Sequence, residues 1–255
     1  MAITAADVKA LREKTGAGMM ECKKALEESN GDMAAAEKAL KEKGLAAMAK
    51  RSERATSEGR LFIRQDGNKV AVIELTCETD FVAKNADFIK VGEQMLDVTL
   101  AKGYTKVEAE HESILEPLKV SIRENMKIAK VEVIDVPATA SAAFYVHSDF
   151  KTGAVVVVDG STSDAVKAFA KDCCLHIAAF TPAYTSKKDV PESYVAEQKE
   201  IFKAQMDQDE KMAGKPDNVK EGILQGKINK HLAEICFEDQ MFVKDDKKTV
   251  AAKLA

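Results

Sequence analysis

The order of hydrophobic and polar residues predicts three short helices within the first 44 residues. Apolar positions recur with helical spacing in ADVKALREKT, in MMECKKALEE and in MAAAEKALKEK. Thr4, with Asp7 three residues later, is typical of a helix start, and Gly16 and Gly44 are typical of helix ends. Such a bundle is near the lower size limit for independent folding. It either binds another molecule or packs permanently against the rest of the chain.

After this region, apolar and polar residues begin to alternate with the two-residue period of β-strands. GRLFIRQ and KVAVIELTC flank Asp66-Gly67-Asn68, which predicts a β-hairpin, and a helix is expected over about 86–101. IAKVEVIDV reads as a third strand. AAFYVHS and TGAVVVVDG then predict a second hairpin, followed by the helix SDAVKAFAKDCCLHIAAF. Because a hairpin followed by a helix occurs twice, we interpret the core as a duplicated α+β unit.

The chain is predicted to be helical again from 190 to about 237. Gly214-Lys215-Pro216 breaks this stretch into a helical hairpin, which is expected to protrude. An apolar stripe along the second helix has the width of a two-helix seam and consists of Leu224, Ile228, Leu232 and Ile235.

These patterns predict an α+β fold. They place a helical bundle at 1–44, a charged linker at 45–59, the duplicated core from 60 onward and a helical hairpin at 190–235.

The stretch TCETDFVAKNADF, at 76–88, is unusual for a corner between a strand and a helix. A large apolar side chain, Phe81, sits beside Asp80 where a fold normally places Gly, Ser or Asn. Phe81 either packs into the core or is directed at another molecule. The second hairpin turns toward its helix with DGSTSD, a plain capping sequence, and this contrast favours a contact role for Phe81.

Composition narrows the class of protein. The chain has 255 residues, of which 45% are hydrophobic and 31% charged, and it contains no apolar run of the roughly 18–20 residues that span a bilayer. No targeting segment is recognisable at the N-terminus, and five cysteines without a paired framework suit a reducing compartment, so a cytoplasmic protein is expected. A net charge of −4 and 5% aromatic residues argue against direct nucleic-acid binding.

A catalytic or metal centre is difficult to assemble from this sequence. Cys173, Cys174 and His176 lie on one predicted helix, where neighbours point about 100° apart, and no zinc or phosphate-loop spacing occurs. We therefore expect no enzyme activity, no metal and no cofactor, with a thiol-dependent enzyme as the competing class. His111 and His231 are expected at the surface.

Two motifs identify the chain as similar to the bacterial elongation factor Ts family. They are LREKTGAGMMECKKALEESNGDMAAAEKALKEKG and CETDFVAKNADF, and the likeness continues through GRLFIR, HIAA and QMFVKDDKKTV. The resemblance implies a ubiquitin-associated-like N-terminal bundle, a two-subdomain core with antiparallel sheets and a coiled-coil protrusion. It thereby divides the chain into six segments, with a core N-subdomain at 60–139, a core C-subdomain at 140–189 with 236–243, and a C-terminal module at 244–255 after the bundle, linker and hairpin. It also implies nucleotide exchange on the GTPase elongation factor Tu, bound to GDP or free of nucleotide.

The resemblance also implies roles for individual residues. The corner would enter the nucleotide domain of the partner and displace its Mg²⁺, through Thr79, Asp80, Phe81 and Val82. Further partner contacts would come from Arg12, Met19, Met20, Lys23, His147, Phe242 and Val243. Family protrusions sometimes dimerise, which leaves a homodimer or a 2:2 complex open. No membrane contact is expected.

Two departures from the family pattern and one alternative function accompany this interpretation. Relatives usually continue beyond the KTV helix, so the C-terminal module is expected to be shorter here, by truncation or by nature. The turn HSDFKTG stands where relatives often have a glycine-rich turn.

The alternative function is a non-enzymatic adaptor that binds a partner through the N-terminal bundle. In that bundle, one of Met19 and Met20 is expected to be exposed.

Overall fold

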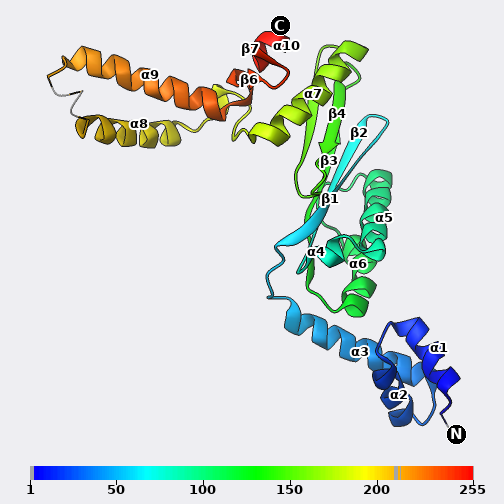
Figure 1. Ribbon diagram of the computed structural model, residues 1–255. Helices are drawn as coiled ribbons and strands as arrows, with labels where there is room; N and C mark the ends of the chain where they lie inside the picture. The colour runs from blue at the N-terminus through cyan, green and yellow to red at the C-terminus, as the bar shows by residue number, and fades with distance from the viewer. Residues whose placement is uncertain (1–2, 210–211, 213, 255) are drawn as a thin grey trace. The chain divides into compact units, whose positions relative to one another are not determined.

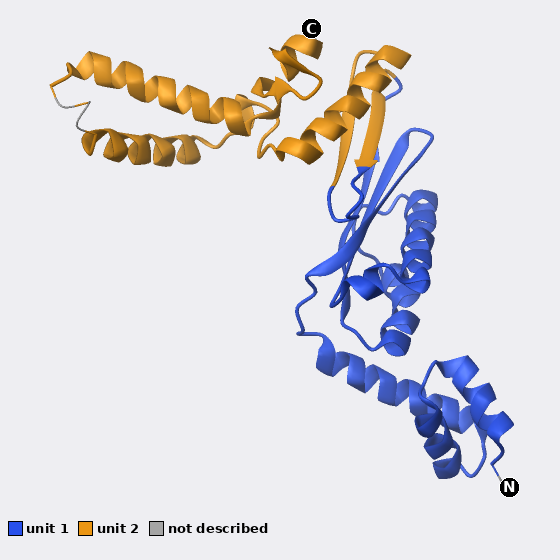
Figure 2. Ribbon diagram, viewed as in Figure 1, with its two compact units in different colours: residues 1–138, 146–152 blue, residues 139–145, 153–255 orange. Residues whose placement is uncertain are grey.

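The computed structural model describes residues 3–209, 212 and 214–254. It combines helices with small β-sheets, which confirms the predicted α+β class (Figure 1). The described residues form two compact units, one within Met1–Ala138 and Val146–Thr152, the other within Thr139–Tyr145 and Gly153–Ala255 (Figure 2). Among the described helices, none is long and apolar enough to cross a membrane. The finer division into six segments stays a prediction.

The first unit starts with the predicted helical bundle, made of α1 (Ala5–Thr15), α2 (Met19–Glu28) and α3 (Met33–Arg51). Thr4 and Asp7 form the expected capping box, with the Asp7 amide donating to the Thr4 hydroxyl over 3.2 Å. The helices pack around a small apolar cluster of Val8, Leu11, Cys22, Ala25, Leu26, Ala36 and Leu40.

The prediction that Gly44 ends the third helix, and that a linker starts there, is wrong for residues 45–51. Helix α3 continues through Gly44 and ends at Arg51. The glycine lies against helix α6 (Ala109–Ile122), where an added Cβ would come within 2.8 Å of a methyl carbon of Val120. Gly44 is therefore small to allow this contact, and the continuous helix leads directly toward the sheet.

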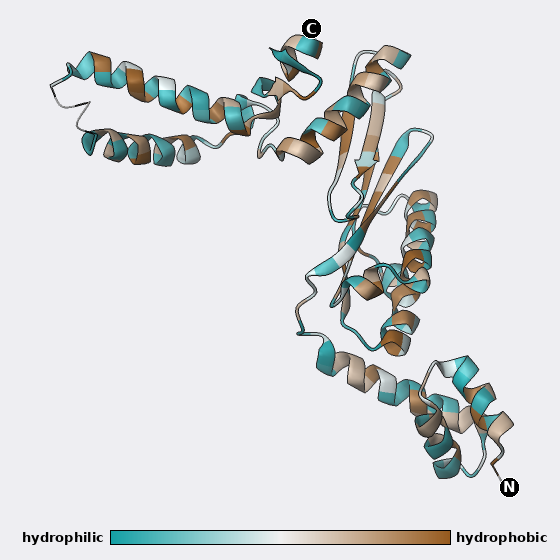
Figure 3. Ribbon diagram, in the orientation of Figure 1, coloured by the Kyte–Doolittle hydropathy of each residue, from teal (hydrophilic) through white to brown (hydrophobic). Residues whose placement is uncertain are grey.

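A three-stranded antiparallel sheet forms the centre of the first unit, with β2 (Lys69–Cys77) between β1 (Glu58–Asp66) and β3 (Met126–Asp135). The predicted hairpin turn is confirmed, with Gly67 in the left-handed region at φ 54°. Figure 3 shows hydrophobic residues along these strands, and helix α5 (Ala86–Lys102) covers the sheet. The shared core contains Phe62, Ile73, Leu75, Phe88, Met95 and Leu96.

The turn between β4 (Ser141–Val146) and β5 (Gly153–Val158) belongs to the first unit and lies on the outer edge of β1. The Leu61 amide donates to the Phe150 carbonyl over 2.7 Å. The Arg60 guanidinium lies 3.6 Å from the centre of the Phe150 ring. Phe150 itself is left-handed, at φ 60°, within this turn. The cation–π contact and the edge hydrogen bond offset that unfavourable conformation.

The second unit contains the two-stranded sheet of β4 and β5, packed against helix α7 (Asp164–Phe180). Both predicted hairpins are thus followed by a helix. The predicted helical hairpin is also present, as α8 (Glu192–Asp207) and α9 (Asp217–Ile235).

The seam of the helical hairpin is apolar, as its sequence stripe predicted. Leu224, Ile228 and Leu232 of α9 are buried against α8, and Ile235 is half-buried. Residues 210, 211 and 213 of the expected first helix, and residues 1, 2 and 255 of the terminal segments, lie outside the described residues. Short strands β6 (Met241–Phe242) and β7 (Asp245–Thr249) and helix α10 (Val250–Leu254) follow the hairpin.

The prediction that His111 and His231 lie at the surface is wrong. His111 is fully buried, where Nδ1 accepts from the Glu108 amide over 3.0 Å and Nε2 bonds the Thr99 hydroxyl over 2.9 Å. His231 is half-buried and bonds the Tyr194 hydroxyl. Burial lowers the pKa of His111, because the charged imidazolium is poorly solvated there.

Gly92 provides a test of how tightly α5 packs on the sheet. A Cβ at this position would lie 2.2–2.5 Å from ring atoms of Phe62. We expect Gly92→Ala to lower the free energy of unfolding by roughly 1–3 kcal/mol, since the core must shift to admit the methyl group. Gly222→Ala in α9 is the matched control, because a Cβ there meets open space and removes a flexible residue from a helix. Urea unfolding measures both variants, and equal stabilities would contradict the packing described.

Candidate functional site at the corner after strand β2

The corner begins where the chain leaves β2 and forms one short helical turn, α4 (Asp80–Ala83). Thr79 caps this turn by accepting a hydrogen bond from the Val82 amide over 3.4 Å. Asn85 caps the next helix in the same way, accepting from the Asp87 amide over 2.8 Å. Capping residues on both sides of α4 fix the direction of the chain at this corner.

Phe81 is directed into solvent from this turn. Its side chain is 81% exposed, whereas its neighbours Val82 and Ala83 are both 7% exposed and belong to the core of the first unit. Of the two alternatives left by the sequence, packing into the chain's own core is therefore wrong. A large apolar side chain held in water by a rigid turn is typical of a contact residue.

Asp80 precedes Phe81 and is paired within the same turn. Its carboxylate accepts a hydrogen bond from the Lys84 ammonium over 2.6 Å. This contact lowers the pKa of Asp80 and raises the pKa of Lys84. Asp80 is consequently a carboxylate throughout the neutral pH range, and it presents a negative charge next to the exposed ring.

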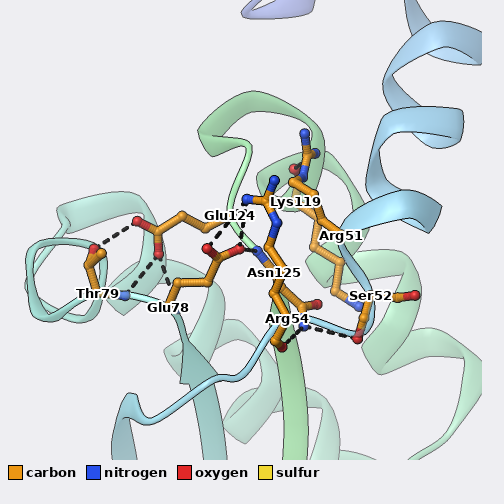
Figure 4. A network of polar contacts seen from close by, with 8 residues as sticks. All are labelled: Arg51, Ser52, Arg54, Glu78, Thr79, Lys119, Glu124 and Asn125. Atoms are coloured by element: carbon orange, nitrogen blue, oxygen red, sulfur yellow. Dashed lines mark hydrogen bonds and ion pairs between the residues drawn. The ribbon is translucent and has the colours of Figure 1, made fainter.

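A polar network lies under the corner. The Glu124 carboxylate accepts from the amides of Glu78 and Thr79, both over 3.1 Å, and from the Thr79 hydroxyl over 2.7 Å. The Glu78 carboxylate in turn accepts from the Asn125 amide over 2.6 Å. Figure 4 shows how hydrogen bonds of Ser52 and Arg54, just after α3, join the end of that helix to Glu78 and Asn125 beside the corner. Arg51, the last residue of α3, donates to the carbonyl of Lys119 in α6.

The sequence did not reveal this network. Glu124 and Asn125 stand in the connection after α6, more than 40 residues from the corner that they contact. Neither belongs to a motif with known spacing, so no pattern in the chain indicates the pairing.

The bundle also exposes its predicted contact residues. Met19 is 45% exposed and Met20 is 76% exposed at the start of α2, so both side chains are accessible rather than only one. Arg12 and Lys23 are exposed as well. Cys22, next to them, is fully buried in the bundle.

The remaining predicted contact residues occupy different environments. His147 is exposed in the turn after β4, where its amide donates to the Thr152 carbonyl over 2.8 Å. Phe242 is 3% exposed and packs with Cys173 and Val250 in the second unit, while Val243 is 40% exposed. Only Val243 of this pair therefore presents an accessible side chain.

Comparison with known proteins identifies the family. The family model described as Elongation factor TS matches residues 78–255, which includes the whole corner. The elongation factor Ts of Treponema denticola is 52% identical over 260 residues, which cover 100% of this chain and 91% of that relative. Those of Treponema pallidum (strain Nichols) and Borrelia recurrentis are 46% and 40% identical, again over 100% of this chain and 92% of each relative.

The chain belongs to the elongation factor Ts family. This confirms the resemblance drawn from its two motifs and makes the chain a translation elongation factor. The relatives match the full chain, so the helical bundle that precedes the family-model match is also part of the shared sequence.

The cysteines and the possible metal ligands bear on the competing class, a thiol-dependent enzyme. No group of three or more His, Cys, Asp or Glu among the described residues could hold a metal ion. All five cysteines are buried and free. Burial raises the pKa of Cys77 to about 11, of Cys173 to about 12 and of Cys174 to about 11.

Thiol labelling tests the competing enzyme class. Because the thiolate is the reactive form and burial disfavours it, we expect the native protein to react slowly with a thiol reagent between pH 7 and 9. All five cysteines react rapidly once the protein is unfolded in urea, which is the internal control. One cysteine that reacts fast in the native protein, with a rate that follows a pKa below about 8, would support a thiol-dependent activity instead.

Proposed function

We propose that this chain is a guanine-nucleotide exchange factor for elongation factor Tu. It binds the GTPase with GDP, promotes GDP release and leaves a nucleotide-free complex to which GTP binds. Membership of the elongation factor Ts family supports this partner. The observation that carries the proposal is the 81% exposed Phe81 on a turn whose neighbouring side chains are buried.

Exchange of this kind needs no covalent step. A GTPase holds GDP through its phosphate loop and a bound Mg²⁺. Disturbing the metal therefore lowers the affinity of the GTPase for GDP. In our proposal Phe81 enters an apolar pocket of the nucleotide domain, and Asp80 disturbs the ligands around the Mg²⁺. Thr79 and Val82 hold the turn, through the cap and the core contact described above. This effect is reciprocal, because the factor and GDP lower each other's affinity for the GTPase by the same ratio.

The charge of Asp80 suits this role. The carboxylate is ionised at neutral pH and is held by Lys84, which also shields it in the free factor. Near a metal site, Lys84 would be available to pair with groups released from the Mg²⁺, while Asp80 repels the anionic ligands of the metal. Asp80 and Lys84 can therefore alter the electrostatic environment of the partner's metal while both side chains keep their charge.

Other contacts in the proposed complex extend over several parts of the chain. Arg12, Met19, Met20 and Lys23 of the bundle offer adaptable apolar and cationic side chains, which suits binding to the nucleotide domain. His147 would approach a different domain of the partner. Val243 would contribute a contact from the C-terminal module, with Phe242 supporting it from the core of the second unit.

The proposal includes a setting for this activity. The factor works in the cytoplasm, acts as a binding protein rather than an enzyme, takes no cofactor, and contacts neither nucleic acid nor membrane directly. Its complex forms as one factor with one GTPase, or as a 2:2 assembly if the factor dimerises.

Removing the Phe81 ring tests the proposal directly. We expect Phe81→Ala to slow factor-stimulated release of a fluorescent GDP analogue from elongation factor Tu by roughly thirtyfold, which corresponds to a hot spot of about 2 kcal/mol. The free energy of unfolding should change by less than about 0.5 kcal/mol, since the ring is exposed. Val107→Ala, another exposed apolar residue of the same unit, is the control. Release as fast as with the parent would place the activity elsewhere.

The adaptor function remains a second candidate, because both methionines of the bundle are exposed. It predicts that Met19→Ala with Met20→Ala abolishes binding to elongation factor Tu and that Phe81→Ala leaves binding intact. The exchange function predicts a weaker complex with the methionine variant, by roughly tenfold, and continued exchange at high factor concentration. Titration of GTPase binding together with GDP release distinguishes the two.

A further inference from the structure

Three consecutive residues between α6 and β3, namely Arg123, Glu124 and Asn125, contact three separate parts of the first unit. Arg123 is left-handed, at φ 67°, and ends α6. This conformation reverses the chain, so that the three residues after the helix face different neighbours. We call residues 123–125 the clamp segment.

Glu124 contacts the corner. Its two carboxylate oxygens receive three donors, the amides of Glu78 and Thr79 and the Thr79 hydroxyl, at 2.7–3.1 Å. Hydrogen bonds to a charged acceptor are stronger than those between neutral groups. The amides of Glu78 and Thr79 lie just beyond the end of β2, and in this structure both donate to the Glu124 carboxylate.

Asn125 contacts the connection between α3 and β1. It is 7% exposed, and its side-chain amide donates to the Ser52 carbonyl over 3.0 Å and to the Arg54 carbonyl over 2.6 Å. Its backbone amide donates to Glu78 at the corner. One residue thereby joins the end of the bundle's longest helix to the start of the corner.

Arg123 contacts the bundle itself, through an ion pair with Glu21. Glu21 stands one residue after Met20, and the hydrogen bond from Arg123 lowers its pKa. Both side chains of this pair are partly exposed, so we expect it to contribute less than the part-buried hydrogen bonds of Glu124 and Asn125. The clamp segment nonetheless reaches both surfaces that carry proposed partner contacts.

We infer that Glu124 is a positioning residue for nucleotide exchange, and that it acts by holding the corner in the orientation that presents Phe81. This inference rests on the proposed function of the corner. When Glu124 is absent, the amides of Glu78 and Thr79 lose their acceptor and the Thr79 cap loses its support. The turn then samples several orientations, and the factor must order it on binding.

The test compares two substitutions of Glu124. Glu124→Ala removes every acceptor, and we expect the second-order rate constant of factor-stimulated GDP release to fall by roughly ten- to a hundredfold. Glu124→Gln keeps one oxygen for the two amides and an NH₂ group that can donate to the Thr79 hydroxyl, and it should retain activity within about threefold of the parent. Glu112→Ala, which removes a surface carboxylate of α6 paired with Lys119, is the control.

The dependence on factor concentration separates positioning from contact. A saturating concentration of the Glu124→Ala factor should restore most of the maximal rate, because Phe81 is still present once the corner has been ordered. Phe81→Ala lowers the maximal rate itself. If Glu124→Ala lowers the maximal rate and leaves half-saturation unchanged, the positioning role is wrong.

A double-mutant cycle gives a readout that general loss of structure does not mimic. Because Glu124 acts through the corner, Glu124→Ala should change the rate by less than about threefold in a Phe81→Ala background. Fully additive losses would contradict the inference. Hydrogen exchange supplies the structural counterpart, with faster exchange expected at the amides of Glu78 and Thr79 and unchanged exchange at Ile73 and Leu75 in β2.

The outcomes also separate this inference from the proposed function. If the parent does not accelerate GDP release, the proposed function fails. If the parent accelerates release and Phe81→Ala lowers it, while Glu124→Ala behaves as the parent, the function holds and the positioning role of Glu124 is refuted.

Discussion

At the end of strand β2 the backbone leaves the sheet, and the amides of Glu78 and Thr79 require an acceptor outside the strand ladder. The Glu124 carboxylate is that acceptor. Much of the first unit follows from this requirement. The loop after α6 must pass next to the corner, α6 must end where its left-handed residue directs the chain back, and Asn125 then lies within reach of the end of α3.

The rigid corner explains how a fold tolerates an exposed phenyl ring. Exposing a side chain of this size forgoes roughly 1.5–3 kcal/mol of hydrophobic stabilisation. Val82 and Ala83, directly after Phe81, recover part of that loss by packing into the core. A partner that covers the ring regains the remainder, and the ordering of the turn has already taken place in the free protein.

Much of this architecture could be predicted from the sequence, because the controlling interactions are local. The capping box of Thr4 and the turn at Gly67 depend on residues within three positions of each other. Gly44 misled the prediction, since the glycine serves a contact with Val120 of another helix rather than a helix end. His111 was misplaced because its partners, the Glu108 amide and the Thr99 hydroxyl, make burial of an imidazole favourable in a way that periodicity does not show.

The same distinction applies to the site. An apolar residue in a polar corner is visible in the sequence, so Phe81 could be identified before the structure was known. Glu124 could not, since nothing local distinguishes it from the many exposed glutamates of the chain. Its importance depends on a tertiary contact with residues that precede it by about 45 positions.

The turn that carries Phe150 has a consequence for solubility. Strand β1 is an edge strand, and the edges of sheets attract strands of other chains and promote aggregation. Here the Leu61 amide, which points away from the sheet, donates to the Phe150 carbonyl, and the Arg60 guanidinium lies over the Phe150 ring. Lys151 of the turn forms an ion pair with Glu58 over 2.6 Å. The turn thus covers part of the outer edge of β1 and hinders a foreign strand from pairing there.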